Sequence, residues 1–118
     1  LYQSGLHVPL LIHIPSKYKS LAPNVATSGT INTELVGFID LAPTMLSLAG
    51  ITIPQTMQGR AILGNQAKPE PDYMVGFRDR MDERYDCSRA VRDHHYLYIR
   101  NWMPYRPQGQ YLEYMFQT

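Results

Sequence analysis

The sequence predicts a small α/β fold in two parts, with a strand and a helix in residues 1–69 and a small antiparallel sheet in residues 70–118. Three observations predict it. Apolar residues alternate over residues 6–14, an amphipathic run covers residues 41–49, and short strand-like segments flank a turn within residues 73–100. Charge also separates the parts, because residues 1–69 hold six charged side chains and residues 70–118 hold fifteen.

The first element expected is a strand over residues 6–14. Its alternating apolar positions are Leu6, Val8, Leu10, Ile12 and Ile14. The intervening positions are partly apolar as well, which is typical of a strand covered on both faces. Pro9 cannot donate to a ladder and favours the start or an edge of the strand, and Pro15 ends the run.

The second element is a helix over residues 41–49, which we expect to be scaffold. Asp40 suits the position that caps a helix, and Pro43 is tolerated in the first turn because the early N–H groups have no partner within the helix. Gly50 suits the left-handed residue that follows a helix.

The second half predicts strands over residues 73–77, 87–92 and 96–100. The turn Asp93-His94-His95 joins the last two, so we expect antiparallel pairing. Three apolar residues should face a core, namely Ala90, Leu97 and Ile99, and three arginines should point outward, namely Arg89, Arg92 and Arg100.

Composition excludes several classes of protein. A net charge of +1 predicts no attraction to nucleic acid, and no run of about 18 apolar residues is present to span a membrane. The single Cys87 excludes an internal disulfide and a multi-cysteine zinc site. The chain starts without Met and ends in an aromatic stretch, so we expect an internal piece of a longer protein.

The candidate functional residues are charged. Four carboxylates alternate with arginines between residues 78 and 86, namely Asp79, Asp82, Glu83 and Asp86. This pattern lacks the central glycine of a calcium loop, so we expect no metal site and interpret it as a solvated ion-pair cluster or as a site for an anion. His94 and His95 are adjacent and point to opposite faces of a strand, which favours a turn over a metal site.

Several sequence blocks, read together, resemble type I sulfatases. They are SGLHVP at residues 4–9, DLAPTMLSLAG at residues 40–50 and MQGR at residues 57–60. Residues 77–86 and 100–104 resemble the sulfoglucosamine-sulfohydrolase-like branch of that family. The resemblance covers nearly the whole chain and implies the C-terminal part of an alkaline-phosphatase-like sulfatase fold, with one central-sheet strand and a helix followed by a small antiparallel sheet.

The resemblance implies a parent enzyme that hydrolyses sulfate esters or sulfamates with a formylglycine nucleophile and a calcium ion. Formylglycine arises from the Cys or Ser of a C/S-x-P-x-R motif, which residues 87–91, Cys-Ser-Arg-Ala-Val, do not match. We therefore expect no catalytic residue and no metal ligand in this chain, and no activity of the chain alone.

The same resemblance implies substrate-binding residues. His7 lies in a block near the substrate pocket of similar sulfatases. Asp79 and Asp82 are expected to accept hydrogen bonds from sugar hydroxyls, and Arg80 and Arg84 to pair with an anionic group.

The partners implied are the remainder of the sulfatase chain and a sulfated carbohydrate, with a periplasmic, extracellular or lysosomal location. Two alternatives stay open. One is a non-catalytic carbohydrate-binding or interaction module with the same fold, and the other is a phosphodiesterase or phosphonate hydrolase of the same superfamily.

Overall fold

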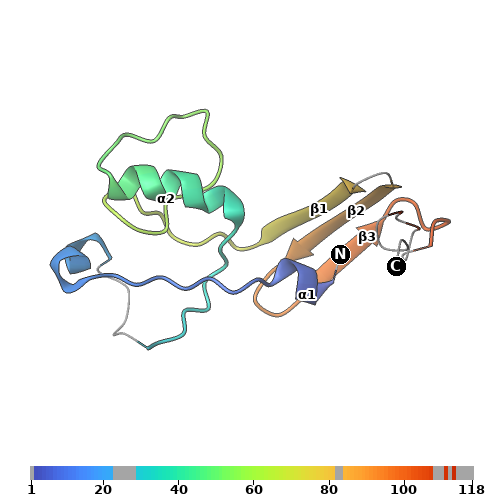
Figure 1. Cartoon of the computed structure of the whole chain (residues 1–118), viewed down its shortest axis with the longest axis horizontal. Helices are drawn as coiled ribbons and strands as arrows, with labels where there is room; N and C mark the ends of the chain where they lie inside the picture. The colour runs from blue at the N-terminus through green and yellow to red at the C-terminus, as the bar shows by residue number, and fades with distance from the viewer. Residues whose placement is uncertain (1, 23–28, 82–83, 108–110, 112, 114–118) are drawn as a thin grey trace. The chain divides into compact units, whose positions relative to one another are not determined.

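The structure is a computed structural model that describes residues 2–22, 29–81, 84–107, 111 and 113. It divides into two compact units, one of residues 10–72 and one of residues 1–9 with residues 73–118. The expected mixed α/β class is confirmed, with a helix in the first of these units and a three-stranded antiparallel sheet in the second (Figure 1).

The helix of the unit formed by residues 10–72 is α2, Leu41–Leu48, which confirms the helix expected over residues 41–49. A 3-10 turn, η2 at Phe38–Asp40, leads directly into it. At its end Gly50 takes a left-handed backbone with φ of 71°. The N–H groups of Gly50 and Ile51 then donate to the carbonyls of Ser47 and Leu46, which is a Schellman motif.

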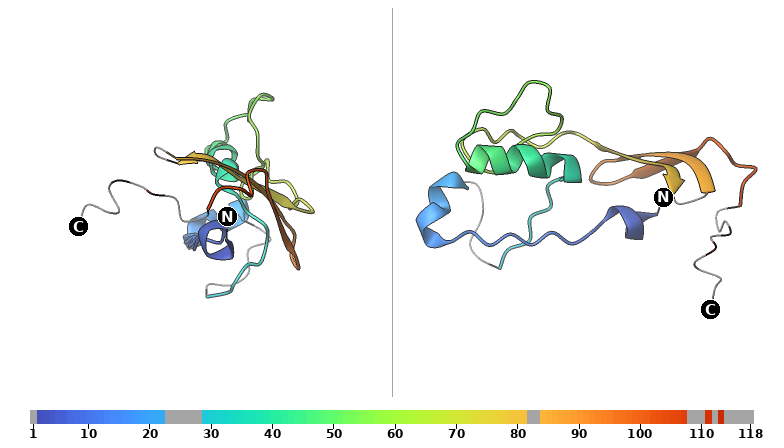
Figure 2. Two further views of the ribbon diagram at one scale, coloured as in Figure 1. Left: turned by 90° about the vertical axis from the view of Figure 1, so that its right-hand side faces the viewer. Right: turned by 45° about the horizontal axis from the view of Figure 1, so that its top comes forward.

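One face of α2 holds the following loop through three buried side-chain acceptors. The three hydrogen bonds run from Arg60 N to Asp40 Oδ1 (2.8 Å), from Ile62 N to Thr44 Oγ1 (3.0 Å) and from Gln66 N to Ser47 Oγ (3.0 Å). Residues at spacings of four and three share one helix face, so Asp40, just before α2, and Thr44 and Ser47 within it form one stripe that binds the loop at three positions. Figure 2 shows this loop beside α2.

Asp40 occupies the position before the helix, as predicted, but its carboxylate makes no capping bond to α2. Its second oxygen, Oδ2, accepts the N–H of Gly37 at 3.0 Å. The capping bond expected from the sequence is therefore replaced by bonds that join the segments on either side of the helix.

Two loop glycines lie too close to their neighbours for any side chain. Gly64 has φ of +87°, and a Cβ there would collide with the side chain and backbone of Ser47. Gly59 has φ of +84°, and a Cβ there would collide with the carbonyl of Ile39. Both positions require glycine for the positive φ and for the close approach of the loop.

Arg60 stabilises the same loop from its other side. The guanidinium donates to the carbonyls of Lys68 (2.8 Å) and Leu35 (3.2 Å) and pairs with the Glu34 carboxylate at 3.2 Å. The residue is only 9% exposed, so these bonds hold a nearly buried charge.

The sheet of the other unit contains β1 (Met74–Met81), β2 (Arg84–Arg92) and β3 (Leu97–Asn101) in the order β1-β2-β3. The three predicted strands are confirmed: β1 extends further at its end, β2 begins earlier than predicted, and β3 is displaced by one residue. The charged residues that follow position 77 lie within these strands, because β1 continues to Met81 and β2 begins at Arg84. Ion pairs between these two strands, described below, explain why charged residues form strands here.

The two faces of the sheet differ in exposure. We call the first the covered face, whose residues are Met74, Gly76, Arg78, Ser88, Ala90, Arg92, Leu97, Ile99 and Asn101. The second, the open face, consists of Val75, Phe77, Asp79, Arg89, Val91, Tyr98 and Arg100, with Trp102 directly after β3. The short helix α1 (Gln3–Leu6) packs on the covered face, because Leu6 contacts Gly76 and the side chain of Gln3 accepts a bond from Arg92 at 3.3 Å.

The strand predicted over residues 6–14 is wrong. Leu6 ends α1, and residues 7–15 have no regular secondary structure. Alternation of apolar side chains determines which of them share a face, but a strand also needs backbone partners from a second strand. No segment among the described residues supplies such partners to residues 7–15.

None of the helices in the described part of the chain combines the length and the apolar character that crossing a membrane requires.

Replacing Asp40 tests the contacts between α2 and its loop. Asp40→Asn keeps the shape of the side chain but directs an amide N–H₂ group at a backbone donor. We expect unfolding in urea to show a loss of about 2 kcal/mol, the usual range for a buried hydrogen bond to a charged group. The exposed Asp72 provides a matched control, because Asp72→Asn should change stability by less than about 0.5 kcal/mol. Equal effects of the two substitutions would contradict this account of the loop.

The β2–β3 turn gives a prediction for pH. Asp93 Oδ1 accepts the N–H groups of His95 (2.7 Å) and Tyr96 (2.5 Å), and these bonds lower the pKa of Asp93 below its ordinary value of 3.8. A carboxylate with a lowered pKa stabilises the fold above its unfolded-state pKa and loses that effect as pH falls through its folded-state pKa. The stability advantage of the native chain over Asp93→Asn should therefore be full at neutral pH and vanish below pH 3.8. Urea titrations of both proteins from acid to neutral pH measure it, and a constant difference would refute the assignment.

Candidate functional site

The charged residues between positions 78 and 89 meet where β1 and β2 pair. Arg78 pairs with Ser88, whereas Arg80 pairs with Tyr85, so Asp79 alone opposes two residues of β2. This is a β-bulge, which changes the direction of side chains and recurs beside functional sites. The bulge thus determines how the carboxylates and arginines of the hairpin are grouped.

Asp79 and Arg89 form a two-bonded ion pair on the open face. Arg89 Nη1 lies 2.8 Å from Asp79 Oδ1, and Nη2 lies 3.3 Å from Oδ2. The hydrogen bond to Asp79 raises the pKa of Arg89. The side chains are 42% and 40% exposed, so solvent screens the pair and its main effect is to fix the orientation of the carboxylate.

Asp86 has a different role, because it is buried beneath the bulge. Its oxygens accept the N–H of Cys87 at 2.8 Å and the hydroxyl of Ser88 at 3.4 Å, and Arg78 lies 3.6 Å away. In these contacts the carboxylate oxygens of Asp86 accept hydrogen bonds from within the protein. The pattern interpreted from the sequence as a solvated ion-pair cluster does contain ion pairs, but Asp86 is not solvated.

Tyr85 adds a phenol to the site. The neighbouring Cys87 raises the pKa of Tyr85 by charge and by a hydrogen bond, Asp79 raises it further, and Arg89 opposes this effect. The phenol is protonated at neutral pH at its ordinary pKa of 10.0, and the raised pKa moves it further from ionisation. The site therefore combines a fixed carboxylate, a guanidinium and a neutral hydroxyl, a set that can bind sugar hydroxyls and anionic groups.

The structure brings together only some of the predicted site residues. Asp79 lies in the cluster, and Arg80 is exposed on β1 beside it. Arg84 begins β2, and Asp82 lies outside the described residues. The exposed His7 follows α1, which packs on the covered face, so the structure does not place His7 beside Asp79 on the open face.

Sequence reasoning missed Arg89 and Tyr85 as members of this site. Both lie on β2, and the sequence indicated that Arg89 points outward. The register of the hairpin would have identified them. That register depends on the bulge, which no turn motif in the sequence indicates.

Within residues 2–22, 29–81 and 84–107, no three His, Cys, Asp or Glu side chains are placed to hold a metal ion. Asp79 and Asp86 do not form such a group, because each binds a different arginine. The residues described therefore do not fit a calcium site.

Comparison with known proteins places these elements in a family. The family described as "N-sulphoglucosamine sulphohydrolase, C-terminal" matches residues 1–103. An ulvan-active sulfatase of Formosa agariphila is 39% identical over 95% of this chain, and arylsulfatase K of Xenopus laevis is 35% identical over 53% of it. No solved structure matches the chain.

The chain spans only 17% of the length of that ulvan-active sulfatase and 10% of that arylsulfatase K. The matched residues include α1, α2 and the whole three-stranded sheet, so the match extends over both units. The chain thus belongs to the N-sulphoglucosamine sulphohydrolase C-terminal family of sulfatase domains.

Proposed function

We propose that this chain is part of a sulfuric ester hydrolase that acts on sulfated carbohydrates. The observation that carries the proposal is the family match over residues 1–103, together with 39% identity to an ulvan-active sulfatase over nearly the whole chain. The relatives are named as sulfatases, which favours this function over the phosphodiesterase and phosphonate hydrolase alternatives.

In this proposal the reaction needs residues beyond this chain. A formylglycine hydrate would attack sulfur, and a calcium ion would neutralise the sulfate oxygens during the attack. The sequence holds no C/S-x-P-x-R motif, and the described residues do not fit a calcium site. The 118-residue chain by itself is therefore inactive, and the remainder of the parent polypeptide is its first partner.

Exposed apolar side chains support the proposal that this chain packs against the remainder of the parent polypeptide. Leu10, Leu11 and Ile12 are 51%, 91% and 51% exposed in a continuous run. Soluble proteins rarely leave adjacent large apolar residues in water unless another surface covers them. We propose that the parent enzyme acts in the periplasm, the extracellular space or the lysosome.

The proposed role of this chain is to bind the carbohydrate. Asp79 is oriented by Arg89 and accepts hydrogen bonds from sugar hydroxyls. Arg80 is exposed on the neighbouring strand position and pairs with an anionic group of the substrate. Arg84 begins β2 of the same hairpin, and we propose that Arg84, Asp82 and His7 also contribute to binding.

Peptide mapping of the parent polypeptide by mass spectrometry tests the function. We expect a Cys or Ser converted to formylglycine outside this chain, sulfate release by the parent that a calcium chelator abolishes, and no sulfate release by the 118-residue chain. A parent without formylglycine would refute the proposal and favour a non-catalytic carbohydrate-binding module. Sulfate release by the isolated chain would refute the proposal that catalysis needs residues outside this chain.

A substitution in the parent enzyme tests the role of Arg80. Arg80→Gln removes a charged donor from the substrate and should raise KM by about 10-fold or more with a small sulfated sugar, the effect of losing one charge-assisted bond. Arg92→Gln is the matched control, since Arg92 bonds to Gln3 on the covered face and should leave KM within about two-fold. An unchanged KM in Arg80→Gln would remove this residue from the substrate site.

A further inference from the structure

The open face of the sheet carries an uncompensated positive charge. The register places Phe77, Arg89 and Arg100 in one row across the three strands. Asp79 pairs with Arg89, whereas no ion pair joins Arg100 to a carboxylate within the described part of the chain. Asp79 offsets the charge of Arg89, so the charge of Arg100 is the one in this row that an anion would offset.

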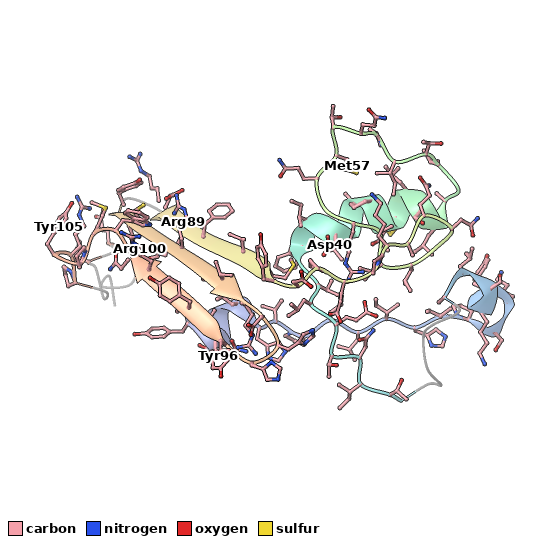
Figure 3. The ribbon with its side chains drawn as sticks, turned by 180° about the vertical axis from the view of Figure 1, so that it is seen from behind. Asp40, Met57, Arg89, Tyr96, Arg100 and Tyr105 are labelled. Atoms are coloured by element: carbon pink, nitrogen blue, oxygen red, sulfur yellow. The ribbon has the colours of Figure 1, made fainter. Side chains whose placement is uncertain are left out.

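Arg100 is also held in one orientation. Its guanidinium carbon lies 3.7 Å from the centroid of the Trp102 ring. Stacking of this kind fixes the guanidinium plane and leaves the N–H groups at its edge free to donate to oxygen atoms. Figure 3 labels Arg89 and Arg100 on the sheet. A sulfate group, with several oxygens around one centre, suits such an edge.

Flat apolar side chains surround the arginine row. Phe77 is 70% exposed, Tyr98 is 64% exposed and Trp102 is 53% exposed. A row of Val75, Val91 and Tyr98 continues this surface on one side of the arginines. The C–H faces of sugar rings pack on aromatic rings, and the guanidinium of Arg100, which has no carboxylate partner among the described residues, suits an anionic group. A charged row through the middle of the face therefore favours an anionic sugar over an apolar protein segment.

We propose that the open face binds a sulfated oligosaccharide, with Arg100 receiving a sulfate group and the rings of Phe77 and Tyr98 receiving sugar rings. This inference rests on the proposed function, since it takes the ligand from the same substrate class. It adds a binding contact to the carbohydrate chain of the substrate, away from the sulfate group that is hydrolysed.

Trp102 is the only tryptophan in the sequence, so its fluorescence reports directly on this face. The 118-residue chain is titrated with a dextran sulfate octasaccharide and, separately, with unsulfated dextran of the same length. We expect a saturable change in emission with the sulfated sugar and at least about 10-fold weaker binding without sulfate. A uronate oligosaccharide of equal charge should bind more weakly than the sulfated one.

Substitutions test which residues of the open face bind the sugar. Arg100→Gln should weaken binding by about 10-fold or more, and Tyr98→Ala by about 5-fold, whereas Arg92→Gln on the covered face should change it by less than about two-fold. Circular dichroism checks that each variant is folded. If Arg100→Gln does not fold, Arg100→Lys, which keeps the charge but loses the planar stack, should weaken binding by about 3-fold.

Several outcomes would overturn the inference. They are an absent change in emission, equal binding of the unsulfated or uronate sugar, equal losses in Arg100→Gln and Arg92→Gln, and self-association of the chain that buries Trp102. The two proposals fail separately, because binding by this chain needs no turnover. A formylglycine-containing parent with no sugar binding at the open face would refute only this inference, and binding without formylglycine in the parent would refute only the sulfatase function.

Discussion

The unit formed by residues 10–72 depends on one interaction, the capture of loop N–H groups by a buried polar stripe of α2. Asp40, Thr44 and Ser47 lie on one helix face and accept bonds from successive parts of the loop. A loop that follows a helix without pairing into a sheet needs partners from elsewhere in the fold for its buried N–H groups. Since an unsatisfied buried group costs about 1–3 kcal/mol, this stripe determines the path of the loop.

The same interaction explains why so little apolar surface is buried there. The acceptors occupy the helix face that would otherwise hold aliphatic residues, and Gly59 and Gly64 let the loop backbone approach closely. The buried apolar side chains in this region are small or few, with Ala61 and Leu63 the clearest cases. Polar complementarity over a short distance therefore takes the place of a large hydrophobic core.

In the sheet, too, polar and charged side chains determine the local structure. The bulge opposite Asp79 separates two carboxylates, so that Asp86 is buried under the strands while Asp79 stays on the open face with Arg89. This division gives one carboxylate a structural role and leaves the other oriented toward solvent. Under the proposed function such groups would recognise the hydroxyls and sulfates of a substrate, and a hairpin supplies them on a more rigid support than a loop does.

Local patterns in the sequence determined much of this protein. The spacing of apolar residues predicted α2, the turn at Asp93 predicted the β2–β3 hairpin, and the sulfatase-like blocks predicted the family. Each depends on residues close together in the chain. Tertiary structure decided that residues 7–15 form no strand, that Asp40 binds a loop, and that Asp79 meets Arg89. These outcomes depend on strand partners and on register, which are set by segments distant in sequence and so leave no local signal.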